Sequence, residues 1–400
     1  MGGERNKMLN IRNLGGMLSP FSDAEMERRL SAGQKIIRDL GLDCIILYGH
    51  CDNNGGAIKY FTEITPVGSG AYGILPKEGK IFVTAHATSG MPITPPEYTR
   101  TVGESIGHVY GSNLGYTSYL YIDQMLEWLK KLGYKRIGIY RPHVIPNLLI
   151  ESLRENIDGL DLVMGFDDEI DYLKSVKSEE EIELLRKTVE VHDNVYASLE
   201  CFVRPGRVER DVAADIKKVC LDMGCESLNI MIATGNPYAR HKFFLAQNTV
   251  IQPGDTIDLL IEVTWVGGYW GELSRMWCLG EPSAELVKSV EDNFKIQDMI
   301  AKMIKPGVKA ITIREEMVKF QIENGYFPER RFFGHSMGPD MVDRPAYAIG
   351  ETMEFRENMF VSIHPGLETK TIWTINTDNY LVTKDGAQWL NTTPRKLFLK

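Results

Sequence analysis

Along the first 170 residues, apolar positions change repeatedly from helical to strand spacing. Ser22 and Glu25 have the spacing of a capping box before a stretch of helical period, and Gly41 follows that stretch as a stop signal. The pattern predicts, in chain order, a helix over 23–40, a strand over 44–48, a hairpin over 70–83, a helix over 123–132 and a strand over 136–140. Helices and strands that alternate in this way are typical of an α/β domain built around a layered sheet.

The pattern changes after residue 172, where long helical periods begin. Ser178 and Glu181 form a second capping-box pattern, which predicts a helix over 179–201, and another long helix is expected over 283–304. We therefore predict two domains, residues 1–172 and residues 173–400, which also suits a chain of this length.

A faint repeat marks the second domain. A Pro-Gly turn at 205–206 recurs at 306–307, an offset of 101 residues, and the helix expected after each turn ends at Gly224 and Gly325, again 101 residues apart. Two helix–turn–helix–strand halves that wrap one curved sheet would bring side chains from both halves together at its centre.

Between the two Pro-Gly turns lies an apolar strand, 256–263, followed by a chain reversal at Gly267 and Gly268 and a second strand that carries Glu272. Glu262 and Glu272 are ten residues apart, so the turn decides whether they meet. A three-residue loop centred on Gly267 pairs them on one face of the hairpin, whereas a two-residue Gly-Gly loop puts them on opposite faces. The sequence is compatible with both arrangements.

Composition narrows the choice of partners. The chain has 400 residues, of which 43% are hydrophobic and 25% charged, and a formal net charge of −9, which disfavours a nucleic-acid partner. No apolar run approaches the roughly 20 residues that span a bilayer, and residues 1–20 lack the apolar core of a secretory signal. The six cysteines are scattered without C-x-x-C spacing, as in a reduced protein. We expect a cytoplasmic protein without membrane or nucleic-acid partners.

Several short motifs together resemble one known superfamily. They are LKSVKSEEEI at 173–182, the Pro-Gly turn at 205–206, the segment 235–241, PGD at 253–255, GHSMG at 334–338 and LVTKDG at 381–386. In combination they resemble the creatinase / aminopeptidase P / methionine aminopeptidase (M24) superfamily. The resemblance implies an α+β fold. A C-terminal pita-bread domain, a pseudo-twofold curved antiparallel sheet with flanking helices, would follow an α/β creatinase-type N-terminal domain. It also implies a homodimer.

Metallopeptidases of this superfamily bind two metals through Asp, Asp, His, Glu and Glu, and the matching positions here differ. The second Asp position is Glu272, the His position is His335, the first Glu position is His364, the last Glu position is Thr377 beside Asp378, and the first Asp position falls among Leu260, Ile261 and Glu262. A two-metal centre requires oxygen donors that bridge both ions, so a functional two-metal peptidase is not expected.

The resemblance is closer to creatinases and ectoine-hydrolase-like members, which work without metal. It implies that His241 transfers a proton while Glu272, His335 and His364 position water or substrate; a surface histidine is the alternative for His241. No cofactor is the first expectation. The alternative is a single Zn²⁺ or Fe²⁺ bound by a set drawn from Glu262, Glu272, His335, His364 and Asp378.

The substrate side of the prediction rests on one arginine and four aromatic residues. Arg344 matches a substrate-holding arginine of creatinase and would bind a carboxylate, unless it is a surface loop residue. Core packing is likewise the alternative for the expected aromatic walls of the pocket, Tyr238, Phe243, Tyr269 and Trp270. Arg275 is expected to form an ion pair that organises Glu272.

These observations predict a C–N hydrolase, or a lytic enzyme, that acts on a small polar and carboxylated molecule. A metal-dependent hydrolase or lyase of the same fold is the first alternative. The second alternative is a non-catalytic binding protein, in which the histidines would not converge in one cleft.

Overall fold

The computed structural model of the protein describes residues 10–50, 55–68, 70–109, 114–236 and 247–400. The chain forms two compact units, Met1–Lys174 and Ser175–Lys400, and each is described by itself.

The first unit is built on a six-stranded sheet with the strand order β6-β5-β4-β3-β7-β8. Its elements are β1 (Arg12–Leu14), β2 (Met17–Ser19), α1 (Asp23–Asp39), β3 (Cys44–Gly49), α2 (Gly56–Thr62), β4 (Ala71–Pro76), β5 (Ile81–His86), β6 (Val102–His108), η2 (Gly115–Thr117), α3 (Tyr119–Leu132), β7 (Arg136–Ile139), α4 (Asn147–Asn156), β8 (Asp161–Val163) and α5 (Asp167–Ser175).

Both faces of this sheet are covered, which explains why its central strand is continuously apolar. On β3, Ile45 and Leu47 pack into a core that includes residues of α1 and α2, whereas Cys44 and Ile46 pack into a second core that includes residues of α3 and α4. Successive side chains of a strand point to opposite faces, so an unbroken apolar run is the pattern of a strand buried on both sides. The predicted α/β layering of the first unit is confirmed.

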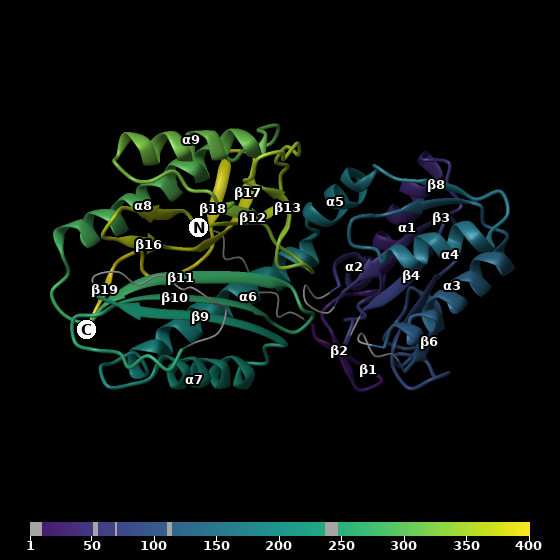
Figure 1. Ribbon diagram of the computed structural model, residues 1–400, viewed down its shortest axis with the longest axis horizontal. Helices are drawn as coiled ribbons and strands as arrows, with labels where there is room; N and C mark the ends of the chain where they lie inside the picture. Colours follow the sequence, from purple (N-terminus) through teal and green to yellow (C-terminus); the bar gives the residue numbers. More distant parts are fainter. Residues whose placement is uncertain (1–9, 51–54, 69, 110–113, 237–246) are drawn as a thin grey trace. The chain divides into compact units, whose positions relative to one another are not determined.

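The second unit carries two larger sheets and a small hairpin, with strand orders β19-β11-β10-β9, β13-β12-β14-β17-β18 and β15-β16 (Figure 1). Its elements are α6 (Glu179–Ser198), η3 (Leu199–Cys201), α7 (Glu209–Asp222), β9 (Ser227–Gly235), β10 (Thr256–Thr264), β11 (Trp270–Cys278), α8 (Ala284–Met303), α9 (Ala310–Glu323), β12 (Gly334–Ser336), β13 (Asp343–Ala346), β14 (Phe360–Ile363), β15 (Gly366–Glu368), β16 (Trp373–Ile375), β17 (Asp378–Thr383), β18 (Gly386–Trp389) and β19 (Phe398–Leu399).

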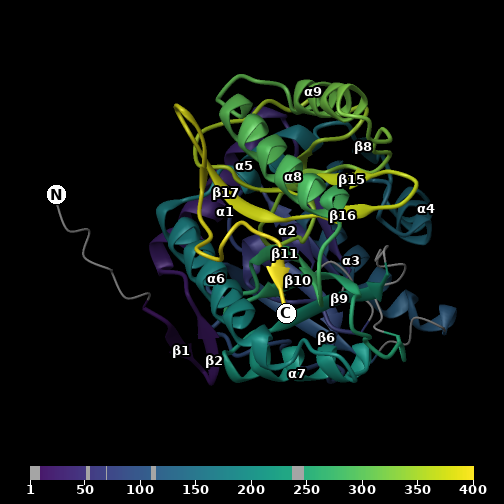
Figure 2. The ribbon, with the colours of Figure 1, turned by 90° about the vertical axis from the view of Figure 1, so that its left-hand side faces the viewer.

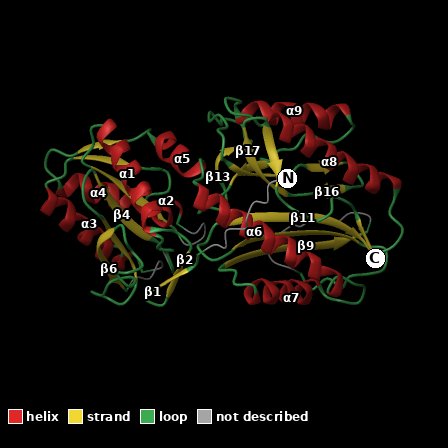
Figure 3. Ribbon diagram, turned by 180° about the vertical axis from the view of Figure 1, so that it is seen from behind, coloured by secondary structure: helices red, strands yellow, loops and turns green. Residues whose placement is uncertain are grey.

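The predicted repeat is present as two matching helix pairs. Gly206 and Gly307 occupy the same left-handed backbone region, with φ of 83° and 86°, and the 14-residue helices α7 and α9 follow each turn. The amide of Gly206 donates to the carbonyl of Ile251, and that of Gly307 donates to Phe355 in the other half. Helix α6 contacts β11 and helix α7 contacts β9, whereas α8 contacts β18 of the second sheet and packs against α9 (Figures 2 and 3). The pseudo-twofold pita-bread architecture is confirmed.

Side chains of β10 alternate between a side that faces the helices and a polar side. Residues 257, 259, 261 and 263 belong to the core that also holds residues of α6 and α7. The even positions between them point the other way and include Asp258 and Glu262, both buried. Burying polar side chains costs free energy, so their presence on the inner face of this sheet indicates a functional site there.

The helix caps differ in one respect from the prediction. Ser178 and Glu181 form a complete capping box at the start of α6. At α1, Ser22 accepts a hydrogen bond from the backbone of Glu25, but the Glu25 carboxylate pairs with Arg28 and Arg29. Helix α3 begins at Tyr119, four residues before the predicted start.

No helix within the described part of the chain combines the length and the low polarity that crossing a membrane would require.

Candidate functional site

The register of the β10–β11 hairpin settles which face Glu262 takes. Glu262 and Glu272 are directly opposite each other, and the last pair, Thr264 with Trp270, leaves a loop centred on Gly267. Opposed residues of an antiparallel pair share one face. The turn is therefore centred on Gly267, but the pairing leaves a loop of five residues, 265–269, where three were expected. Both glutamates point to the polar inner side.

Two histidines come from the other half of the repeat by the same logic. His335 lies on β12 opposite Ser362 of β14. His364 follows two residues after Ser362, and its amide donates to the carbonyl of Phe333, which continues the pairing beyond the strand. Residues two apart on a strand share a face, so His335 and His364 point to the same side of the sheet.

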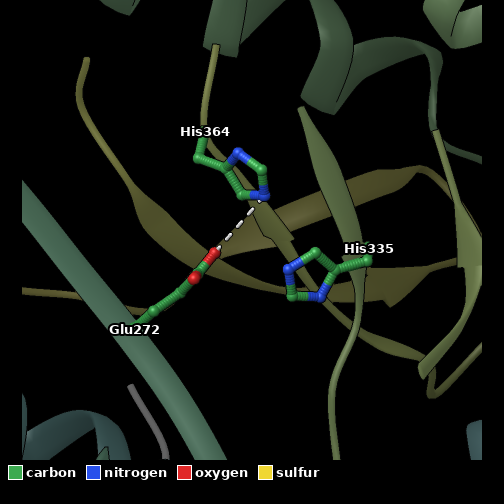
Figure 4. A group of neighbouring side chains, drawn as sticks. All are labelled: Glu272, His335 and His364. Carbon is green, nitrogen blue, oxygen red and sulfur yellow. Dashed lines mark ion pairs between the residues drawn. The ribbon is translucent and has the colours of Figure 1, made fainter. Parts of the chain in front are cut away.

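The two halves bring Glu272, His335 and His364 together (Figure 4). One ligand atom from each of the three lies within 4.8 Å of the others, and all three side chains are buried. Nε2 of His364 lies 3.8 Å from Oε1 of Glu272, and the two imidazole rings have centroids 5.2 Å apart. Buried Oε1 of Glu272 has no hydrogen-bond partner among the described residues. An unpartnered buried carboxylate oxygen beside two imidazoles is suited to a metal ion or a polar reactant.

Hydrogen bonding and burial fix the state of the histidines. Nδ1 of His335 lies 3.0 Å from the carbonyl oxygen of Ser336, so Nδ1 carries the proton and Nε2 is left as the acceptor or ligand nitrogen. Burial, the neighbouring His335 and then the charge of Arg331 hold the pKa of His364 well below its ordinary value. His364 is therefore neutral, the form in which histidine binds metals or accepts protons.

Glu262 is the fourth polar residue beside this cluster. Burial and then the negative charge of Glu272 raise the pKa of Glu262 well above its ordinary value. Its carboxyl group consequently keeps a proton and donates a hydrogen bond to Glu272, and the side-chain amide of Asn229 donates to its Oε2. Two carboxyls this close share one proton because both cannot be charged in a buried site.

Some predicted site residues lie elsewhere or outside the description. His241, Tyr238 and Phe243 fall outside the described residues. Tyr269 is buried and its hydroxyl donates to Glu181 over 2.7 Å, so it is tied to the start of α6. Trp270 is also buried.

The predicted carboxylate anchor, Arg344, is held by an acidic neighbour. Its Nε lies 3.3 and 3.2 Å from the two oxygens of Glu351, and its Nη2 donates to Oε1 over 2.6 Å. A guanidinium in a bidentate contact with a carboxylate has its strongest recognition edge occupied.

The expected pairing of Arg275 with Glu272 is wrong. Glu272 and Arg275 are three residues apart on β11, so their side chains point to opposite faces of the sheet. Arg275 instead donates from Nη2 to Asp378 over 2.7 Å. Asp378 also contacts Arg395 and accepts from Trp389. The prediction that included Asp378 among the possible metal ligands is therefore corrected. Asp378 is not a member of the Glu272–His335–His364 group, because its carboxylate is bound in this buried ion pair.

Three residues that support the site were not predicted. Asn229 donates to Glu262, and Asn379 binds both the amide and the carbonyl of Glu272 at 3.1 and 2.7 Å. The ring of Phe332 lies 5.6 Å from that of His335 and 6.2 Å from that of His364. Only Phe332 had a sequence signal, its position close before His335, since the two amides reach the site through pairing between distant strands.

Comparison with known proteins gives a consistent picture. The model of metallopeptidase family M24 matches residues 183–392. A probable dipeptidase PepE of Mycobacterium tuberculosis is 29% identical over 231 residues, 57% of this chain and 61% of the relative, so the match spans less than two thirds of that relative. A creatinase of a Bacillus species is 25% identical over 393 residues, 91% of this chain and 86% of the relative. The structure of an Xaa-Pro dipeptidase from Bacillus anthracis matches with a TM-score of 0.75 at 20% identity, covering 94% of this chain and 100% of that one.

Proposed function

Because this chain belongs to metallopeptidase family M24, we propose that it hydrolyses a C–N bond in a small, carboxylate-bearing substrate at a centre formed by Glu272, His335 and His364. The observation that carries the proposal is the convergence of these three buried side chains, with ligand atoms within 4.8 Å, from opposite halves of the repeat. Relatives named as dipeptidases and as a creatinase support the reaction class. The convergence weighs against the non-catalytic alternative.

The family implies divalent metal, and the residues fit one ion better than two. Thr377 stands where the resemblance expects the last carboxylate, and Asp378 is bound to Arg275. Among the described residues, the group that could hold a cation contains one carboxylate, that of Glu272. Two ions held close together need bridging carboxylates, whereas two imidazoles and one carboxylate form a complete set for a single transition-metal ion.

Glu272, His335 and His364 would hold the cation, which when bound would supply Lewis acidity at the scissile bond. Neighbouring groups of the protein orient these three ligands. The Ser336 carbonyl fixes the tautomer of His335, the Glu262 carboxyl donates to the Glu272 carboxylate, and Asn379 accepts a hydrogen bond from the backbone amide of Glu272. In the hydrolysis, water gives its oxygen to the carbon of the C–N bond and a proton to the departing nitrogen. We assign that proton transfer to His241 on the resemblance to creatinase.

Metal-free catalysis by the same residues is the second candidate. It is favoured by His364, whose lowered pKa keeps the imidazole neutral while its Nε2 lies 3.8 Å from Oε1 of Glu272, because a neutral imidazole can accept a proton from water or substrate. The homodimer expected from the resemblance remains a prediction.

Metal stoichiometry separates the two candidates. Protein stripped with chelator and titrated with Zn²⁺, Co²⁺ or Fe²⁺ in a calorimeter should bind one equivalent per chain, and elemental analysis of the dialysed complex should agree. His364→Ala and His335→Ala should each weaken this binding at least about tenfold, since each removes one ligand of three. His143→Ala, which changes a histidine of the first unit, should leave it unchanged. Two tight equivalents per chain would contradict the one-ion arrangement, and no binding would leave the metal-free mechanism.

A further inference from the structure

Four of the described helices, α1, α3, α7 and α9, end in the same kind of turn. In each, a glycine with positive φ follows the helix, and the amide of the next residue donates to the carbonyl five residues before it. This is a Schellman motif, in which the two residues joined by that hydrogen bond commonly pack side chain against side chain. The joined pairs are Ile37 with Leu42, Leu129 with Tyr134, Gln321 with Tyr326 and, at the end of α7, Cys220 with Cys225. The α7 pair is the one of the four that consists of two thiols.

The turn at the end of α7 holds these two cysteines side by side. The amide of Cys225 donates to the carbonyl of Cys220 over 3.0 Å, and the amide of Gly224, with φ of 85°, donates to Leu221 over 3.0 Å. Both cysteines are free thiols of one buried core cluster, and the thiol of Cys220 donates a hydrogen bond to that of Cys225. The backbone bond and the thiol contact fix both ends of the pair, so an S–S bond can form with little movement of the backbone.

The two thiols differ in acidity. The hydrogen bond from Cys220 lowers the pKa of Cys225, against the opposing effect of burial. The same hydrogen bond, followed by burial, raises the pKa of Cys220. Because the thiolate is the reactive form of cysteine, Cys225 is the thiol that reacts first, with Cys220 in contact with it.

A small oxidant can reach this pair from solvent. Leu221 is 59% exposed and Gly224 is exposed, so the last turn of α7 lies at the surface. Cys225 itself is 6% exposed, whereas Cys220 is completely buried. Helix ends fray, and opening of this last turn uncovers both sulfur atoms without unfolding the rest of the unit.

The same turn is attached to the β10–β11 hairpin of the candidate site. Nε1 of Trp265 donates to the carbonyl of Met223 over 3.0 Å, and the amide of Gly267 donates to Oε1 of Glu226 over 3.2 Å. A cross-link at the end of α7 would therefore act on the segment that holds the turn of this hairpin.

We propose that Cys220 and Cys225 are a redox-active dithiol, which hydrogen peroxide converts into an intramolecular disulfide that locks the turn between α7 and β9. The Cys225 thiolate first attacks the peroxide: an S–O bond forms, the O–O bond breaks, and the departing hydroxide takes up a proton as water. The Cys220 sulfur then attacks the sulfur of Cys225, the S–O bond breaks, and a second water leaves with the proton of the Cys220 thiol. The dithiol loses two electrons and the peroxide is reduced to two waters. This modification is independent of the proposed function.

Peptide mapping of the native full-length protein tests the proposal. Both cysteines lie in one tryptic peptide, 219–240. A small molar excess of hydrogen peroxide should make this peptide lighter by the mass of two hydrogen atoms, while the peptides that contain Cys44 and Cys278 stay reduced. The linked protein should unfold at a Tm several degrees above that of the reduced protein, and dithiothreitol should remove both the link and the shift.

Three serine variants separate the roles of the cysteines. Cys220→Ser leaves Cys225 without its partner, so Cys225 should accumulate as a sulfenic acid that dimedone captures. In Cys225→Ser, the rate of oxidation at position 220 should fall at least about tenfold, since the more acidic thiol is gone. Cys201→Ser, which removes an exposed cysteine outside the pair, should form the link as the wild type does.

The wild-type measurement decides the proposal even if a serine variant fails to fold. Peroxide that oxidises Cys201 but leaves the peptide 219–240 in its dithiol form would overturn the proposal, and so would a link that appears only in urea. A linked protein with a lower Tm than the reduced protein would also overturn it, because the native turn would then not accommodate the bond.

Discussion

Glu272→Gln should lower kcat/KM by about 10³-fold or more on the dipeptide or N-acyl amino acid that the wild type hydrolyses fastest. The substitution keeps the shape of the side chain but removes the charge of the carboxylate whose Oε1 faces His335 and His364. A neutral amide is a poor ligand for a divalent cation and cannot accept a proton at neutral pH. The same variant should therefore also lose most of its metal affinity in the calorimetric titration, which is a measurement independent of turnover.

Glu262→Gln is the matched control for this prediction, because it makes the same chemical change on the residue directly opposite. Glu262 is protonated and donates to Glu272, and an amide can also donate a hydrogen bond there. We expect kcat/KM of this variant to fall by no more than about tenfold, which corresponds to the free energy of about one hydrogen bond. Equal losses in the two variants would contradict the separate roles assigned to the two carboxyl groups. More than a tenth of wild-type activity in Glu272→Gln would remove Glu272 from the reaction centre.

Arg275→Met should destabilise the second unit by about 3–5 kcal/mol. Arg275 and Asp378 are both fully buried, and the five guanidinium contacts reach Asp378 and the carbonyls of Ser274, Thr377, Thr393 and Pro394. They join β11 of the first half to β17 of the second half and to the C-terminal segment. Methionine fills much of the volume but leaves a buried carboxylate and several carbonyls without donors. Urea unfolding followed by circular dichroism measures the loss.

Lys218→Met provides the comparison for this stability prediction. Lys218 pairs with Asp222 over 2.6 Å, a distance like that of the buried pair, but both side chains are mostly exposed on α7. Exposed pairs contribute little, so the unfolding midpoint should not move measurably. Adding Asp378→Asn to Arg275→Met should recover part of the loss, because it removes the uncompensated charge. Similar midpoints for Arg275→Met and Lys218→Met would contradict a structural role for the buried pair.

The elements and the repeat could be predicted from the sequence because their signals are local. Ser178 and Glu181 are three residues apart and close a capping box wherever the helix lies. Gly206 and Gly307 are required by the left-handed backbone of each turn, so the same two-residue motif appears at both positions. The helix and strand periods report which face of each element is apolar. They led to the correct fold class, and the His335 and His364 positions followed from the resemblance.

Contacts between distant segments could not be read in this way. Two loops were compatible with the glycines at 267 and 268, and only the β10–β11 register placed Glu262 beside Glu272. The strand period puts Arg275 on the face opposite to Glu272, but its partner Asp378 lies 103 residues away in the other half of the repeat.

Caps, turns and periodicity act over a few residues, so the helices, the strands, the duplicated scaffold and the polar residue types available for chemistry could be predicted from the sequence. Which of those side chains meet depends on register and on pairing between the two halves, and these arise from contacts that span the chain. Glu272 and the two histidines are brought together by that pairing, and the same pairing takes Asp378 out of the site.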